Sequence, residues 1–275
     1  MKKRKYALSA APQAPKTAPI LLTGDICECL KKAAELGYDA IEYHTRENAE
    51  FDYGLIRKTM DDCGCRISMI ITGRLYTEGG FSLTSNDAEN RRYAVKGMKM
   101  YVDMASEVGA GIVIGWAKGK ISESGSREEY FKKLDEALYE LDEYAAYKKV
   151  PVMLEVINHY ETDAFVTAHE TAEYIKSRKF KSIFSHLDVF HMQLEELNYG
   201  SAIAENAGLL GYVHLADSTR WYPGSGYINF EEILEALDQI GYEGYLSVEC
   251  FPHDDNIDTA SKALGYMKKL DETMI

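Results

Sequence analysis

The alternation of short β-rich runs with amphipathic helical stretches, repeated through the whole chain, is the feature that most constrains the fold. The runs with strand character cover residues 6–10, 40–44, 66–72, 111–116, 152–157, 183–188, 211–216 and 245–250. Helical patterns between or after them cover residues 25–36, 93–108, 128–147, 168–178, 229–237 and 258–270. Eight strand–helix units in 275 residues match the rhythm of an α/β fold of the (β/α)8 TIM barrel type, which is typically about 250 residues long. An open doubly wound sheet is the alternative.

The chain shows no low-complexity linker and no shift in composition, so we predict a single domain over residues 1–275. Two long connections, residues 12–24 and 73–90, follow the first and third predicted strands. Active sites of barrels are built from the loops at the C-terminal ends of the strands. We therefore expect both connections to lie on the face that carries the site.

Composition excludes several classes of protein. No apolar run approaches the roughly 18 residues of a membrane span. The apolar stretch near the N-terminus is too short for a secretory signal, so we expect a mature, cytoplasmic protein. The chain has 31 basic and 44 acidic residues, and its net charge of −13 would repel nucleic-acid phosphates. We expect reduced cysteines and no structural zinc site, because the side chains of Cys27 and Cys29 diverge on a helix.

Polar side chains stand at the ends of the last four predicted strands. Glu155, Asp188, His214 and Glu249 are separated by 33, 26 and 35 residues, each about one strand–helix unit. In a barrel, all four therefore converge on one rim. Taken alone, an acid after a strand is more often a helix cap or a solvated group, and a lone histidine is more often a core residue. The joint pattern favours a common site.

Three carboxylates buried together need a neutralising positive charge, because each desolvated anion costs several kcal/mol. A divalent cation is the simplest solution. One imidazole and three carboxylates form an oxygen-rich set that favours Mn²⁺, with Mg²⁺ or Co²⁺ as alternatives, over Zn²⁺. We therefore predict Glu155, Asp188, His214 and Glu249 as metal ligands, with positions left open for water or a chelating substrate.

Three segments carry a resemblance to a known family. They are residues 154–161 (LEVINHYE), 186–192 (HLDVFHM) and 214–226 (HLADSTRWYPGSG). Together they resemble the D-tagatose 3-epimerase group of the xylose isomerase-like TIM barrels, also called sugar phosphate isomerase/epimerases. The likeness runs from the first strand to Glu249 and is sharpest from 150 to 252. It implies the same four metal ligands, and it adds substrate contacts at Glu161, His191 and Arg220.

The resemblance implies metal-dependent C3 epimerisation of a free ketose. A metal-bound ketose loses its C3 proton to form an enediolate, and epimerisation needs a proton-transfer group on each face. Glu155 and Glu249, on the fifth and eighth predicted strands, are the expected catalytic pair. His186 is not predicted as a ligand, and Asp217 is expected to orient a ligand or substrate hydroxyl or to lie on the surface. The aromatic residues Trp116, Trp221, Tyr76 and Phe81 are candidate walls of the pocket.

Other activities stay open on the sequence alone. The same residues would serve an aldose–ketose isomerase or a sugar-phosphate epimerase. A DNA-repair endonuclease is less favoured, because it needs a basic groove and a richer ligand set. A non-catalytic sugar-binding protein is disfavoured by the pair of opposed glutamates. The resemblance also implies a homodimer or a homotetramer that binds a small sugar.

Overall fold

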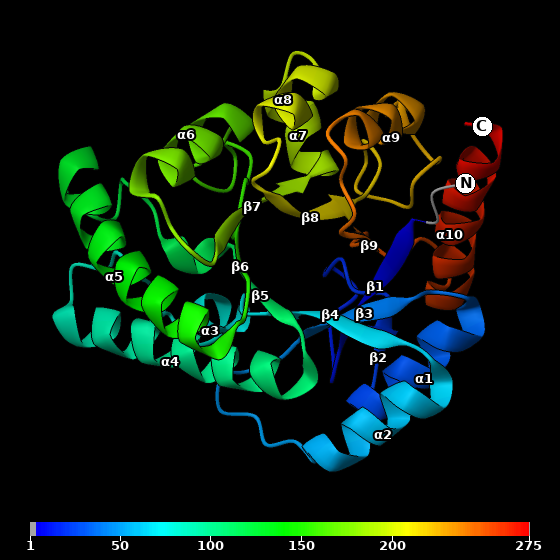
Figure 1. Ribbon diagram of the computed structural model, residues 1–275, viewed down its shortest axis with the longest axis horizontal. Coiled ribbons are helices and arrows are strands. Elements are labelled where there is room, and N and C mark those ends of the chain that lie inside the picture. Colours follow the sequence, from blue (N-terminus) through cyan, green and yellow to red (C-terminus); the bar gives the residue numbers. More distant parts are fainter. Residues whose placement is uncertain (1–3, 275) are drawn as a thin grey trace.

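The computed structural model describes residues 4–274, which form a closed barrel of parallel strands inside a ring of helices (Figure 1). The barrel strands are β1 (Lys5–Ala11), β3 (Ala40–His44), β4 (Arg66–Ile71), β5 (Gly111–Ile114), β6 (Val152–Glu155), β7 (Ile183–Asp188), β8 (Leu210–Leu215) and β9 (Tyr245–Val248). Each pairs in parallel with the next, and β1 pairs with β9 to close the barrel. The short β2 (Leu22–Thr23) pairs in parallel with the last two residues of β1, Ala10 and Ala11. The predicted TIM barrel is confirmed.

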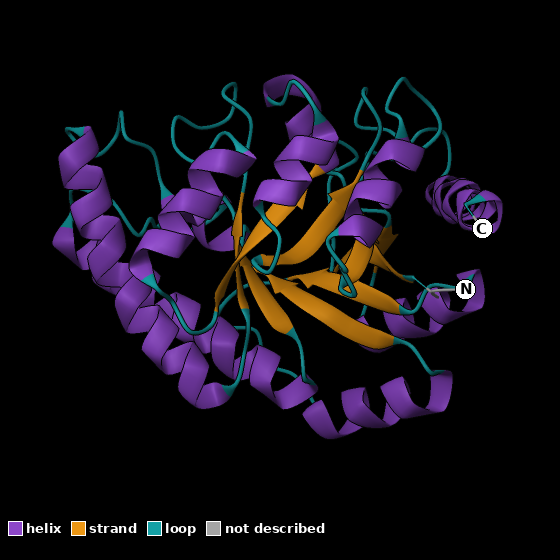
Figure 2. Cartoon of the chain, turned by 45° about the horizontal axis from the view of Figure 1, so that its top comes forward, coloured by secondary structure: helices purple, strands orange, loops and turns teal. Residues whose placement is uncertain are grey.

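Helices cover the outside of the barrel on all sides (Figure 2). They are α1 (Ile26–Leu36), α2 (Tyr53–Cys63), α3 (Arg74–Thr77), α4 (Ala88–Val108), α5 (Arg127–Lys148), α6 (Ala168–Arg178), α7 (Val189–Glu195), α8 (Tyr199–Glu205), α9 (Phe230–Gln239) and α10 (Asn256–Thr273), with a 3-10 turn at Trp116–Lys118. Their ends follow local chemistry. Asp25 caps the first turn of α1, and Gly37 ends α1 in the left-handed conformation, with φ of 88°.

The structure corrects several predicted boundaries. β5 and β6 end at Ile114 and Glu155, two residues before the predicted ends; after β5, Gly115 leads directly into the 3-10 turn at Trp116–Lys118. The helices α2, α3, α7 and α8 were not predicted. Three of these four have seven residues or fewer, too short for a helical period to stand out. The connection 12–24 contains β2, and the connection 73–90 contains α3 and the start of α4.

Two apolar cores hold the barrel together. The larger lies between the strands and the helices and includes Leu8, Ile41 and Leu154, all fully buried. The smaller fills the inside of the barrel and consists of Met69, Ile71, Val113, Met153 and Tyr212. Because side chains alternate along a strand, residues such as Glu155 point inward above Met153. The inner core therefore forms the apolar floor under the polar residues of the C-terminal rim.

The predictions about a membrane span, the cysteines and the domain count have different outcomes. No helix within residues 4–274 is long and apolar enough to cross a membrane. All five cysteines are unpaired thiols. None of them belongs to a group of metal-ligating side chains in the described part of the chain. The single domain over 1–275 stays a prediction, and its residues 1–3 and 275 lie outside the described region.

Candidate active site

The C-terminal rim of the barrel brings the four predicted ligands together around one imidazole nitrogen. His214 Nδ1 on β8 lies 3.8 Å from Glu155 Oε1, 3.9 Å from Asp188 Oδ2 and 3.4 Å from Glu249 Oε2. Asp188 and His214 are fully or almost fully buried, and Glu249 is only slightly exposed. The side chains come from the ends of β6, β7 and β8 and from the residue after β9, as their spacing predicts.

The donor set fits a divalent cation. Asp188 Oδ2 and His214 Nδ1 are buried and have no hydrogen-bond partner, so two ligand atoms face a common point without being satisfied by the fold. Burial and the neighbouring carboxylate of Glu249 raise the pKa of Glu155 to about 8, although His214 opposes the shift. Burial likewise raises the pKa of Asp188. A bound cation would stabilise these carboxylates in their charged forms.

Glu42 on β3 is a part of the site that sequence reasoning missed. Its Oε2 lies 2.8 Å from His214 Nε2 and accepts a hydrogen bond of 3.1 Å from Tyr212 Oη. Burial alone would raise the pKa of Glu42, but His214 lowers it to about 2. A carboxylate on one ring nitrogen fixes the histidine so that its other nitrogen faces the cluster. The available signal was an acidic residue at an inward position of the otherwise uncharged strand Ala40–His44.

Arg220 carries the positive charge of the site. Its Nη2 donates a 3.0 Å hydrogen bond to Glu249 Oε2 and lies 3.7 Å from Asp188 Oδ2, while Nη1 reaches Glu161 Oε1 at 3.5 Å. The guanidinium also packs over the ring of Phe190, 4.9 Å from its centroid. The structure thus places two of the predicted substrate contacts, Arg220 and Glu161, side by side.

The loop that carries Arg220 is organised by Asp217. The carboxylate of Asp217 is fully buried and accepts hydrogen bonds from the backbone N–H groups of Ser218, Gly224 and Ile228. Arg220 itself has a left-handed backbone, with φ of 59°, which a non-glycine residue adopts only when its surroundings impose it. Asp217 therefore holds the loop in place, and does not lie on the surface.

His191 and His186 are both buried near the ligands. His191 Nδ1 lies 2.6 Å from Asn158 Nδ2, and its Nε2 lies 3.6 Å from Asp188 Oδ2. Burial, aided by Arg220, lowers the pKa of His191 to about 3, so the ring is neutral. The ring of His186 packs edge-on against His214 with centroids 4.2 Å apart, and neither of its nitrogens has a hydrogen-bond partner.

These residues open into a cavity of about 490 Å³ at the barrel mouth. Glu155, Glu161, His191, Arg220 and Glu249 line one side of it. The other side is formed by the connection after β1, by the ends of β3, β4 and β5, and by the segment after β4; its residues include Pro15, Ile20, Ile71, Arg74, Val113 and Trp116. A cavity of this size is in the range of small-molecule sites.

Of the four aromatic residues predicted as walls, only Trp116 lines this cavity. Tyr76 Oη donates instead toward the carboxylate of Glu123. Trp221 packs edge-on against His253. The prediction was wrong for Tyr76, Trp221 and Phe81, because strand spacing does not determine which way a loop side chain turns.

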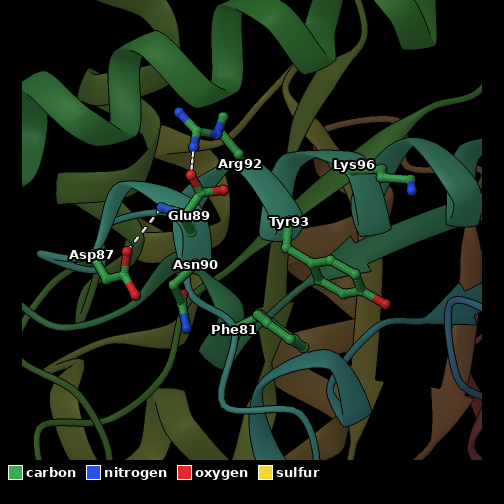
Figure 3. A pocket seen from close by; sticks show the side chains of 7 residues that line it. All are labelled: Phe81, Asp87, Glu89, Asn90, Arg92, Tyr93 and Lys96. Carbon is green, nitrogen blue, oxygen red and sulfur yellow. Dashed lines mark hydrogen bonds and ion pairs between the residues drawn. The ribbon is translucent and has the colours of Figure 1, made fainter.

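Phe81 lies in a separate hollow of about 470 Å³ on the outside of the barrel, lined also by residues of α4 (Figure 3). There its ring stacks on Tyr93 with centroids 4.1 Å apart. Several polar groups of this hollow have partners within the fold. Glu89 N–H donates to Asp87 Oδ1, and Asn90 Nδ2 donates to the carbonyl of Gly80. The hollow therefore anchors the long connection after β4 and offers no unsatisfied polar group of the kind seen at the barrel mouth.

Comparison with known proteins agrees with this geometry. The family model described as "Xylose isomerase-like TIM barrel" matches residues 30–270. The chain therefore belongs to the xylose isomerase-like TIM barrel family.

Relatives whose names give an enzymatic activity narrow the class of enzyme to which this chain belongs. An L-ribulose 3-epimerase of Mesorhizobium japonicum is 30% identical over 88% of this chain and 80% of its own length. A 3-dehydro-D-guloside 4-epimerase of Escherichia coli is 29% identical over 82% of this chain and 87% of its own length. A solved L-ribulose 3-epimerase superposes with a TM-score of 0.83 and 25% identity, covering 98% of this chain and 95% of that one. The chain is accordingly an isomerase of the sugar epimerase kind.

Proposed function

We propose that this protein is a divalent-metal-dependent epimerase that inverts C3 of a free ketose, with Mn²⁺ as its metal. The observation that carries the proposal is the convergence of Glu155, Asp188 and Glu249 on the unpartnered Nδ1 of His214, at the bottom of an open cavity. Relatives named L-ribulose 3-epimerase, ketose 3-epimerase and D-psicose 3-epimerase support the position and the substrate class.

In this proposal, Glu155, Asp188, His214 and Glu249 hold the cation. When bound, the cation supplies a Lewis acid that stabilises negative charge on the oxygens at C2 and C3 of the sugar. Arg220, Glu161 and His191 bind the sugar hydroxyl and carbonyl groups. Arg220 donates to oxygens on which charge develops, and the neutral ring of His191 donates or accepts a single hydrogen bond.

Glu155 and Glu249 transfer the proton. They reach the site from β6 and β9, so they approach a bound sugar from different strands of the rim. One carboxylate removes the C3 proton, and the other, in its protonated form, returns a proton to the opposite face of the planar intermediate.

Two variants test the roles of the carboxylates. Glu155→Gln and Glu249→Gln keep the size of the side chain but remove its ability to transfer a proton. Each is expected to lower kcat for ketose epimerisation by at least 10³-fold, because general acid–base groups contribute about 10²–10⁴-fold and each residue is also a ligand. Near-full activity in either variant would contradict the assignment.

Isotope exchange in D₂O separates this reaction from its rivals. A C3 epimerase incorporates deuterium at C3 of a ketose, whereas an aldose–ketose isomerase incorporates it at C1. A panel of free and phosphorylated ketoses identifies the preferred substrate. Exchange confined to C1, or turnover of phosphorylated sugars alone, would refute the proposal in its present form. We also propose a homodimer or homotetramer, which light scattering after gel filtration would test.

A further inference from the structure

A second group of cation-ligating atoms lies beside the first at the barrel mouth. Glu42 and His44 stand two residues apart on β3, so their side chains share the inner face of the barrel. His44 Nε2 lies 3.8 Å from Glu42 Oε1 and 3.7 Å from Glu249 Oε1. Ligand atoms bound at about 2.1 Å to a single ion lie roughly 3 to 4.2 Å apart. The second group thus has the spacing of a cation site, as the group around His214 has.

Two atoms of this second group have no partner in the fold. Glu42 is fully buried, and its Oε2 is engaged by His214 and Tyr212, but its Oε1 has no hydrogen bond. His44 Nε2 also lacks a hydrogen-bond partner. A buried carboxylate oxygen without a partner is unfavourable, so such an atom normally faces a donor or a cation.

Glu249 joins the two groups. Its Oε2 faces His214 Nδ1 at 3.4 Å and Arg220 Nη2 at 3.0 Å, while its Oε1 faces His44. A carboxylate with its two oxygens directed to two neighbouring sites is the arrangement that bridges paired metal ions, which lie about 3.5–4 Å apart in two-metal enzymes.

The negative charge around the two groups of ligating atoms is large enough to be neutralised by two divalent cations. Five carboxylates surround this region, and two basic side chains, Arg220 and the buried Lys118, lie among them in the described chain. With all seven groups ionised and His214 neutral, as ligand binding requires, the formal charge is −3. The five are Glu42, Glu155, Glu161, Asp188 and Glu249. One divalent cation leaves −1, and a second brings the region to +1. A slightly positive site favours the anionic form of a reacting sugar.

We propose that Glu42, His44 and Glu249 form a second divalent-cation site that shares Glu249 with the first. Two carboxylates and one imidazole select Mn²⁺, Mg²⁺ or Co²⁺. The second site has three protein ligands against four in the first, and one of them is shared, so its ion binds more weakly. His44 and Glu249 line the cavity, so ions and water reach the site from the barrel mouth.

The test is to count Mn²⁺ ions on the full-length protein. Free Mn²⁺ is followed by its solution electron paramagnetic resonance signal during a titration of metal-free protein. We expect two ions per chain, in a tight and a weaker step, and a spin-coupled pair signal at low temperature. His44→Asn should reduce the count to one and abolish the coupled signal. The matched control His169→Asn, which changes an exposed histidine on α6, should retain two ions.

Anomalous diffraction from wild-type crystals grown with Mn²⁺ adds a readout that needs no variant, and two peaks that flank Glu249 are expected. Saturation at one ion per chain, a single peak, or an unchanged count of two in His44→Asn would each overturn the proposal. Loss of both ions in His44→Asn would do the same, because His44 would then belong to the first site. Each readout is independent of turnover, so failure of this inference and failure of the proposed epimerase activity are distinguishable.

Discussion

Binding of a divalent cation to the first site is predicted to release protons. In the cation-free protein at pH 7, the Glu155 carboxyl, with its pKa of about 8, is roughly nine-tenths protonated. His214 is protonated too: burial opposes its charge, but the carboxylates of Glu42 and Glu249 raise its pKa well above the usual value. Both groups must lose a proton to become ligands.

The expected number follows from these two groups. About two protons should leave per ion at pH 7, and fewer at pH 9, where Glu155 is already mostly ionised. The affinity for the cation should accordingly rise about a hundred-fold per pH unit near neutrality. The raised pKa of Glu155 means that this carboxyl binds its proton more tightly in the folded, cation-free protein than in the unfolded chain. The contribution of Glu155 to stability should therefore fall as the pH rises from about 5 to 8, by up to about 1.4 kcal/mol per unit, a loss that Glu155→Gln removes.

Isothermal titration calorimetry in buffers of different ionisation enthalpy measures the released protons directly. Mn²⁺ is added below one equivalent, so that only the tightest site fills. Glu155→Gln removes one titrating group and should release about one proton at pH 7. The control Glu35→Gln, at an exposed position of α1, should release two. Release of less than half a proton by the wild-type protein, or equal release by the wild type and Glu155→Gln, would refute this account of the electrostatics.

Three substitutions probe the scaffold of the site. A Cβ on Gly115 would lie 2.5 Å from Glu155 Oε2, so Gly115→Ala should displace that carboxylate and lower kcat about 10²-fold with little change in the far-UV spectrum; unchanged kcat would contradict this. Arg220→Lys loses the planar fork that donates to the oxygens on which charge develops, and it should lower kcat/KM roughly 10- to 100-fold, mainly through kcat, in steady-state assays. A Cβ on Gly226 would lie 2.4 Å from Asp217 Oδ1, so Gly226→Ala should cost about 1–3 kcal/mol of stability, visible as a lower Tm; an unaltered Tm would speak against the role of Asp217.

The barrel and the convergence of its acidic rim could be predicted because both depend on spacing alone. In parallel strands the register brings the end of each strand to the same rim, so Asp188 and His214 needed only to follow strands one unit apart. The short α7 begins at Val189, directly after β7, and its seven residues show no clear helical period.

Other features depend on side-chain direction, which periodicity does not contain. Glu42 lies in the middle of β3, so a pattern of polar residues at strand ends does not include it, although its charge is unusual for an inward position. Trp221 turns toward His253 because the loop organised by Asp217 points it away from the cavity. Loops of this kind are determined by hydrogen bonds to single buried groups, so their conformation emerges only in the folded structure.

The cavity at the barrel mouth is built from two halves of the chain with different contents. The charged groups of the first cation site and the proposed sugar contacts come from β6 to β9 and the segments after them, whereas the connection after β1 and the ends of β4 and β5 supply a largely uncharged wall that includes Ile20, Val113 and Trp116. The shape of the cavity and the reactive groups within it therefore depend largely on different parts of the chain. Substitutions at wall positions such as Ile20 and Val113 can reshape the range of accepted sugars while the proton-transfer apparatus in the second half stays intact, which makes this wall the natural target for redesigning selectivity.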